Sequence, residues 1–268
     1  MSTKAEILSF CLWGVNTGLI LFLSMEATLG QSLAAFVSAG LGAMLAISIG
    51  VSHRQLCALI SVAAGTLLSA TFFHIIPEAW DVLSPLSIIL ALASGYGFFF
   101  LMSRYVSHVC PACAASHFED QSHSKLKNVF FLLVIALTIH SMMDGIAIAL
   151  GNEMAEGTRH SIFFTIAIHK LPEGLALCAL LLGSGRERVR AFLWALALES
   201  STIWGWAIGH FFLQGHLNHL WMDFVMVHIA GGFVYLSLHA AINEMKDHSS
   251  RFILIFFLLG FLFMALMR

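Results

Sequence analysis

The hydrophobic residues of this chain form long continuous runs instead of an alternating pattern. A helix that crosses the hydrocarbon core of a bilayer needs about 20 mostly apolar residues, and continuous runs favour helices over the alternating strands of a membrane barrel. Such runs lie roughly at residues 6–25, 33–51, 55–77, 84–106, 129–151, 160–183, 189–213, 221–243 and 252–267. The pattern predicts an all-α polytopic membrane protein with about nine transmembrane helices, in a single transmembrane domain over residues 1–268.

Composition agrees with a membrane protein. Hydrophobic residues make up 59% of the chain and charged residues 10%, with a mean hydropathy of +0.88. Soluble domains carry about 25% charged residues. The net charge of −2 and the lack of a basic domain leave nucleic-acid binding without an electrostatic basis.

The basic residues predict an orientation. Cytoplasmic loops of membrane proteins are enriched in Lys and Arg. If the N-terminus is cytoplasmic and nine spans follow, the inside segments hold Lys4, Arg54, Arg104, Lys125, Lys127, Arg186, Arg188, Arg190, Lys246 and Arg251. The outside segments hold only Arg159 and Arg268. We therefore expect a plasma-membrane or inner-membrane protein with its C-terminus external.

The longest polar connection, residues 107–128, falls on the cytoplasmic side in this topology. A Cys-x-x-Cys pair in a reducing compartment binds metal more often than it forms a stable disulfide. The loop is a candidate zinc trap or sensor, with a solvated loop that binds nothing as the alternative. Its candidate ligands are His108, Cys110, Cys113, His117 and His123.

Ionisable residues concentrate in the fifth, sixth and seventh predicted spans, where they are costly and usually mark a bound ion or a pathway. His140 and Asp144 are four residues apart and share one helix face, and His169 and Glu173 repeat that spacing on the next span. Two imidazoles and two carboxylates suit a four-coordinate divalent ion such as Zn²⁺. Since consecutive spans run in opposite directions, the repeated motif also fits an inverted pair around a midplane site.

Three alternatives compete with a metal site. The residues can instead form interhelical hydrogen bonds in a packed bundle. Two matched His-x-x-x-acid sets make this interpretation less favoured than a metal site. A di-haem cytochrome explains the histidines but not the acids. An intramembrane zinc protease is expected to carry His-Glu-x-x-His, which is absent from the sequence.

At these motifs the chain resembles the ZIP (Zrt/Irt-like) family of divalent-metal transporters. The segments His140 to Gly145 and His169 to Gly174 are similar to the family's fourth and fifth conserved helices. His74-Ile75-Ile76-Pro77-Glu78-Ala79 resembles the end of the second helix, and Gly231-Gly232-Phe233-Val234-Tyr235 the seventh. The resemblance implies a ZIP-like helical bundle of eight conserved helices, to which residues 6–25 add one extra N-terminal helix. It also implies import toward the cytoplasm by movement of a metal-carrying helix group against a scaffold, often as a homodimer.

The resemblance also implies a second-metal position, where some family members bind another ion. The matching residues here are Ser141, Lys170 and Glu199, next to Ser200. A protonated lysine has no lone pair to donate, so we expect an ammonium instead of a second metal, paired with Glu199 or bridging the metal carboxylates. A neutral Lys170 that fills space is the alternative. Asp144, Glu173 and Glu199 carry −3 when ionised, Lys170 brings the cluster to −2, and one divalent ion makes it neutral.

The path to and from the centre is predicted at the span ends. The third span runs outward, so His74, Glu78 and Asp81 are expected at the external entrance, where they attract a cation. His239, Asn243 and Glu244 are expected at the cytoplasmic exit.

The hypothesis is a transporter, not an enzyme, that brings Zn²⁺ into the cytoplasm through His140, Asp144, His169 and Glu173. Fe²⁺, Mn²⁺, Co²⁺ and Cd²⁺ use overlapping ligands. Two other classes stay open at this stage. One is a membrane hydrolase with Glu199 as base, and the other is a metal sensor that signals through the cytosolic loop.

Overall fold

The computed structural model describes residues 27–48, 52–106, 123–247 and 250–267, which form helices joined by short connections. The first two rods are the Ala27–Ser48 helix and the run α2 (His53–Ala70), η1 (Thr71–Ile75) and α3 (Ile76–Trp80). They are followed by α4 (Pro85–Val106), α6 (His123–Leu150) with η3 (Gly151–Glu153), and α7 (Glu156–Gly183). The last three are α8 (Arg188–Glu199) with α9 (Ser201–Ile208) and η4 (Gly209–Leu213), α10 (His219–Asp247) and α11 (Ser250–Leu266).

These rods confirm an all-α membrane fold. Six of the described helices are long and apolar enough to cross a bilayer. α11 is shorter, and the α8–α9 rod is interrupted after Glu199. The rods coincide with the second to ninth predicted spans, whereas residues 6–25 lie outside the described residues, so the count of nine stays a prediction.

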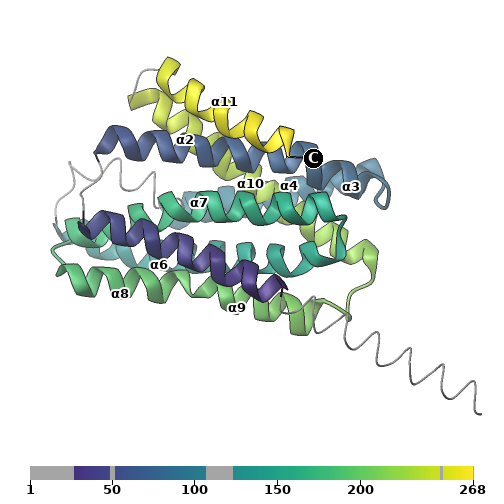
Figure 1. Ribbon diagram of the computed structural model, residues 1–268, viewed down its shortest axis with the longest axis horizontal. Coiled ribbons are helices and arrows are strands. Elements are labelled where there is room, and N and C mark those ends of the chain that lie inside the picture. Colours follow the sequence, from purple (N-terminus) through teal and green to yellow (C-terminus); the bar gives the residue numbers. More distant parts are fainter. Residues whose placement is uncertain (1–26, 49–51, 107–122, 248–249, 268) are drawn as a thin grey trace, which may run out of the picture.

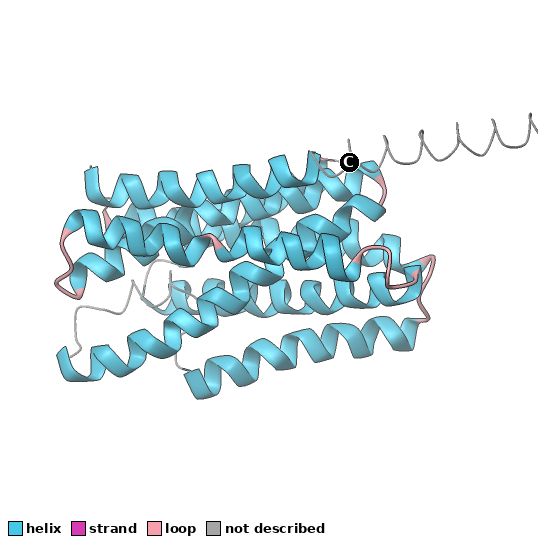
Figure 2. Cartoon of the chain, turned by 90° about the horizontal axis from the view of Figure 1, so that it is seen from below, coloured by secondary structure: helices cyan, strands magenta, loops and turns pink. Residues whose placement is uncertain are grey.

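The helices lie side by side and run along roughly one direction (Figures 1 and 2). We call the end at which α2 begins and α10 ends the inner end, and the end at which α7 begins the outer end. Four spans are central, because 61–67% of the apolar windows in Arg54–Trp80, Val134–Glu153, Glu156–Gly183 and His219–Lys246 is buried. In Ala27–Ser48 and Pro85–Arg104 the buried share is only 22–28%.

Apolar side chains cover the outside and polar ones are enclosed, as a bilayer requires. On the Ala27–Ser48 helix the exposed side chains Leu33, Val37, Leu41 and Met44 recur at helical spacing and form an outward stripe. Inside, Lys170 is among the largest fully buried side chains of the described residues. Such a charge is stable in an apolar bundle only if other charges pair with it.

Reciprocal glycine contacts fasten the helices in pairs. A Cβ at Gly42 would lie 2.0 Å from the carbonyl oxygen of Leu171 on α7, and one at Gly174 would lie 2.0 Å from that of Ala39. Small residues let helix backbones approach closely in membranes. The same reciprocal arrangement joins α2 to α11 through Gly65 and Gly260, α4 to α10 through Gly95 and Gly231, and α6 to α9 through Gly145 and Gly205.

The four pairs combine into two groups of two pairs each, through contacts of α7 with α8 and of α2 with α10. The ligand-bearing group consists of the Ala27–Ser48 helix, α6, α7 and the α8–α9–η4 rod, and the flanking group consists of α2–η1–α3, α4, α10 and α11. Hydrogen bonds reinforce each group: Trp206 Nε1 donates to Thr28 Oγ1 in the first, and Ser237 Oγ to the carbonyl of Ala64 in the second. In Figure 1 α2 and α11 lie along one side of the bundle and α8 and α9 along the other. The groups meet mainly where α2 packs on α7.

The Gly65 contact predicts that even one added methyl group will destabilise the protein. Gly65→Ala places its Cβ 2.1 Å from the carbonyl oxygen of Phe257, and overpacking of this kind costs about 1–3 kcal/mol. We expect a lower melting temperature of the purified protein in detergent. Gly97→Ala on α4 is the control, because a Cβ there has nothing within 4 Å, and it should not lower the melting temperature. Equal melting temperatures for the two variants would contradict the close approach of α2 and α11.

Candidate metal centre

Four side chains from α6 and α7 converge at the centre of the bundle. His140 and Asp144 project from one face of α6, and His169 and Glu173 from the facing side of α7, as the spacing predicts. One candidate ligand atom from each residue lies within 4.8 Å of the others, and all four side chains are buried. The glycine contacts beside them, at Gly145 and Gly174, hold both helices close to their neighbours.

The spacing of the ligand atoms fits a tetrahedral ion. Asp144 Oδ2 lies 3.2 Å from His169 Nε2 and 3.6 Å from His140 Nε2. Glu173 Oε2 lies 3.8 Å from His140 Nε2 and 4.0 Å from His169 Nε2. Zinc bonds of about 2.0–2.2 Å imply ligand–ligand separations of about 3.4 Å in a tetrahedron. Small side-chain adjustments are therefore enough to enclose one divalent ion.

The backbone of α7 orients one of the two imidazoles. His169 Nδ1 lies 2.9 Å from the carbonyl oxygen of Thr165. A carbonyl oxygen only accepts, so Nδ1 is the donor and Nε2 is the ring atom that faces the carboxylates. Such a contact to the far nitrogen fixes the orientation of metal-binding histidines.

Lys170 lies next to this cluster and contacts all three carboxylates. Its Nζ is 2.8 Å from Glu173 Oε2, 3.0 Å from Asp144 Oδ2 and 3.0 Å from Glu199 Oε2. It also donates to Ser141 Oγ at 2.6 Å. Both contacts that the sequence analysis allowed for Lys170 are present, since it pairs with Glu199 and bridges the two metal-facing carboxylates.

The predicted second-metal position is thus only partly assembled as expected. Ser141 Oγ lies 3.4 Å from oxygens of both Glu173 and Glu199, so Ser141, Lys170 and Glu199 form one cluster. Ser200 does not join it, because its Oγ donates to the carbonyl of Ala197 on its own helix. One residue along a helix turns the side chain by about 100°, which directs Ser200 away from the face that Glu199 presents.

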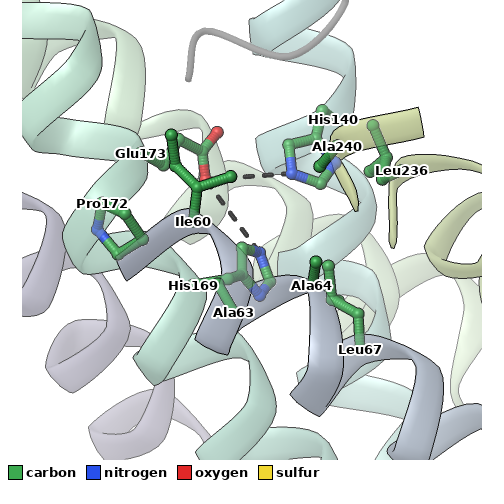
Figure 3. Close-up of a pocket in the computed structure, with 10 residues that line it drawn as sticks. All are labelled: Ile60, Ala63, Ala64, Leu67, His140, His169, Pro172, Glu173, Leu236 and Ala240. Atoms are coloured by element: carbon green, nitrogen blue, oxygen red, sulfur yellow. Dashed lines mark ion pairs between the residues drawn. The ribbon is translucent and has the colours of Figure 1, made fainter. Parts of the chain in front are cut away.

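A cavity of about 50 Å³ adjoins the cluster on the flanking-group side. Figure 3 shows Glu173 and the rings of His140 and His169 turned toward one another, close to Ala63, Ala64 and Leu67 of α2. The other lining residues are Ile60, Pro172, Leu236 and Ala240. Those from α2 lie before His74 and those from α10 in its second half, so the cavity extends from the cluster toward the inner end.

The predicted exit residues lie on the last turns of α10, beyond this cavity. His239 stacks on Tyr235, and its Nε2 is 3.0 Å from Asn243 Nδ2. Glu244, the residue after Asn243, is buried. They follow the cavity along the helix but do not line it.

The predicted entrance residues behave differently from one another. His74 is buried, with its Nε2 3.0 Å from the carbonyl of Met264 and its Nδ1 3.0 Å from Ser161 Oγ, so both ring nitrogens are already engaged. Glu78 lines a second cavity of about 130 Å³ at the outer end. Asp81 is exposed on the turn after α3 and does not line this cavity.

Three polar residues of the outer cavity, Glu153, His219 and Asp223, are not among the predicted entrance residues. Asp223 stands four residues after His219, the same histidine-to-acid spacing as His140 and Asp144 on α6, and it falls inside the eighth predicted span. That carboxylate within an apolar run is the signal that could have identified them. Apolar side chains complete the lining: Val82, Leu150, Met154, Met222 and Met226.

The cytosolic-loop candidates cannot be placed in this architecture. His108, Cys110, Cys113 and His117 lie outside the described residues, and the side chain of His123, at the start of α6, does too. Metal binding by this loop stays a prediction.

Comparison with known proteins agrees with the all-helical membrane fold. The ZIP zinc transporter family matches residues 112–268, which include α6 to α11 and therefore all of the converging side chains. A relative is zinc transporter zipt-7.2 of Caenorhabditis elegans, which is 28% identical over 138 residues. The match covers 50% of this chain and 29% of that protein, so the chain spans under a third of the length of the relative. Because the family match extends over more than half of the sequence, the chain belongs to the ZIP zinc transporter family.

Proposed function

We propose that this protein carries divalent metal ions, most readily Zn²⁺, across the membrane into the cytoplasm, one ion at a time. The observation that carries the proposal is the convergence of His140, Asp144, His169 and Glu173 from two central helices, with ligand atoms within 4.8 Å of one another. The zinc named in the description of the C. elegans relative supports the choice of ion.

The charge of the centre supports a single ion. Asp144, Glu173 and Glu199 contribute −3 when ionised, and the ammonium of Lys170 contacts all three. One divalent ion brings the sum to zero, which lowers the penalty for burying it in the bundle. A second ion would meet the lysine, which has no lone pair. Lys170, Ser141 and Glu199 thus set the local charge in this proposal, without binding metal.

The two cavities support a path. Both cavities are lined by residues from the ligand-bearing and the flanking groups. One cavity lies at the outer end, and the other extends from the cluster toward the inner end. Movement of the ligand-bearing group against the flanking group would connect the centre to each end in turn. Under the predicted orientation the outer end is external, Asp81 on its exposed turn attracts the entering ion, and His239, Asn243 and Glu244 receive the released one. A homodimer is a further expectation from the resemblance.

The hydrolase hypothesis has no support in the geometry. Its base, Glu199, is held by Lys170 at 3.0 Å, and the inner cavity beside the cluster is lined mostly by apolar side chains. A hydrolase needs a substrate cleft and a free acid–base group.

Metal uptake into proteoliposomes tests transport and the ligand set together. Asp144→Asn and His169→Ala should each reduce initial uptake of radioactive Zn²⁺ more than tenfold, because each removes one of four ligands. His228→Gln is the control: His228 on α10 bonds to Ser94 on α4, away from the cluster, and its replacement should preserve uptake. Competition by unlabelled Fe²⁺, Mn²⁺, Co²⁺ and Cd²⁺ ranks the substrates. Uptake that survives the loss of Asp144 or His169 would refute this centre.

Metal stoichiometry tests the role of Lys170. Purified protein should bind one Zn²⁺ per protomer at the centre, and Lys170→Asp should add a second ion because it supplies a carboxylate where the ammonium was. Lys170→Met is the matched control, since it removes the charge without adding a ligand and should stay at one. All variants are measured by equilibrium dialysis with serine in place of the loop candidates His108, Cys110, Cys113, His117 and His123. Two ions at the centre of the otherwise unchanged chain would exclude the single-ion site.

A further inference from the structure

The first turn of α7 is capped by a side chain from another helix. The cap residue of α7, Ala155, has no side-chain oxygen to accept a hydrogen bond from the first turn. Its own backbone N–H instead donates to Glu78 Oε1 at 2.6 Å. In a capping box this N–H is satisfied by an acid inside the same helix. Here the acid comes from α3, so the contact joins the flanking group to the ligand-bearing group.

A second bond joins the same two rods one to two turns further along α7. Ser161 Oγ lies 3.0 Å from His74 Nδ1, and both side chains are buried. His74 Nε2 donates to the carbonyl of Met264 on α11 at 3.0 Å, which fixes the ring within the flanking group. The imidazole therefore bridges α11 and α7.

The interface between the groups differs at its two ends. At the outer end the α2–η1–α3 rod is hydrogen-bonded to α7 through Glu78 and His74. Near the centre and toward the inner end the same rod and α7 line the apolar cavity of about 50 Å³. α7 carries His169 and Glu173, so any displacement of these ligands relative to the flanking group must break the outer bonds.

We propose that Glu78 and His74 form an outer latch, in which hydrogen bonds to Ala155 and Ser161 hold the metal-carrying helix against the flanking group and keep the outer end closed. The proposal rests on the proposed function, because it assigns a step of transport to these residues. It makes Glu78 and His74 positioning residues that act on α7, and it differs from the sequence-based expectation that they attract the entering ion.

Two substitutions break the Glu78 bond from opposite sides. Glu78→Ala removes the acceptor. Ala155→Pro removes the donor without changing any charge, and the backbone already suits proline: Ala155 has φ −54° and Met154 is extended, with ψ 167°. Glu78→Gln keeps an acceptor oxygen and loses only the charge. Glu153→Gln is the matched control, because Glu153 lines the same cavity but bonds to Gln214 within the ligand-bearing group.

Spin labels report the latch directly and without transport. One label replaces Leu86, which is 66% exposed at the start of α4, and the other replaces Gly157, where a side chain meets nothing within 4 Å. Serine replaces Cys11, Cys110 and Cys113, and the buried Cys57 and Cys178 remain. Glu78→Ala and Ala155→Pro should both shift the ratio of closed to open distances about tenfold toward open, as expected for a hydrogen bond to a charged group. Glu153→Gln should keep the unmodified distribution, and Glu78→Gln should shift it less than Glu78→Ala does, because a neutral amide oxygen still accepts the bond but more weakly than a carboxylate.

Zinc uptake and zinc affinity complete the test. Glu78→Ala and Ala155→Pro should lower net uptake about tenfold while the dissociation constant at the centre changes less than twofold. If Glu78→Gln is as defective as Glu78→Ala and Ala155→Pro transports normally, Glu78 acts through its charge on the ion and the latch is wrong. Unchanged distances in Glu78→Ala and Ala155→Pro would also overturn it. If the distances respond as expected but the unmodified protein moves no metal, the latch stands and the proposed function fails.

Discussion

Burial of ionised groups in an apolar bundle is the constraint on which the centre depends. Carboxylates of Asp144, Glu173 and Glu199 lie around one ammonium, that of Lys170, and all four side chains are shielded from solvent. An uncompensated charge in such surroundings costs several kcal/mol. The four groups come from α6, α7 and α8, so their charges compensate one another only when these helices adopt one relative arrangement. That arrangement is also the one in which His140 and His169 face the carboxylates.

The glycine contacts explain how this arrangement is maintained without a hydrophobic driving force between helices. In lipid, helices associate through close packing and hydrogen bonds, and each reciprocal glycine pair brings a Cα within reach of a neighbouring carbonyl. Each of the four pairs joins two helices of the same group. Contacts between the groups instead include side-chain hydrogen bonds at the outer end. Glycine packing thus holds the helix pairs within each group together, whereas hydrogen bonds of side chains join the two groups at the outer end.

Sequence reasoning succeeded where a short-range rule fixes geometry. Helical spacing placed His140 beside Asp144 and His169 beside Glu173, and charge arithmetic led to the contacts of Lys170. It did not foresee that Ser200 turns away from Glu199, because the rod is interrupted after Glu199 and local phase decides which side chain faces inward. Nor did it foresee the engaged nitrogens of His74 or the cap that Glu78 provides for α7, since both depend on partners far away in sequence: Ser161, Met264 and Ala155. The helix pairing through glycines is likewise invisible without knowing which helices are neighbours.

The π-helical turn Thr71–Ile75 has a consequence for the rod that contains it. Pro77 has no N–H and its ring crowds the carbonyl four residues earlier, and the wider turn just before α3 relieves that conflict. A π turn inserts one extra residue, which rotates everything beyond it by about 100° relative to a regular helix. The half of the rod with Ala63, Ala64 and Leu67 therefore has a different angular phase from the half with His74 and Glu78. This one rod presents apolar side chains to the cavity near the centre and hydrogen-bonding groups to α7 at the outer end.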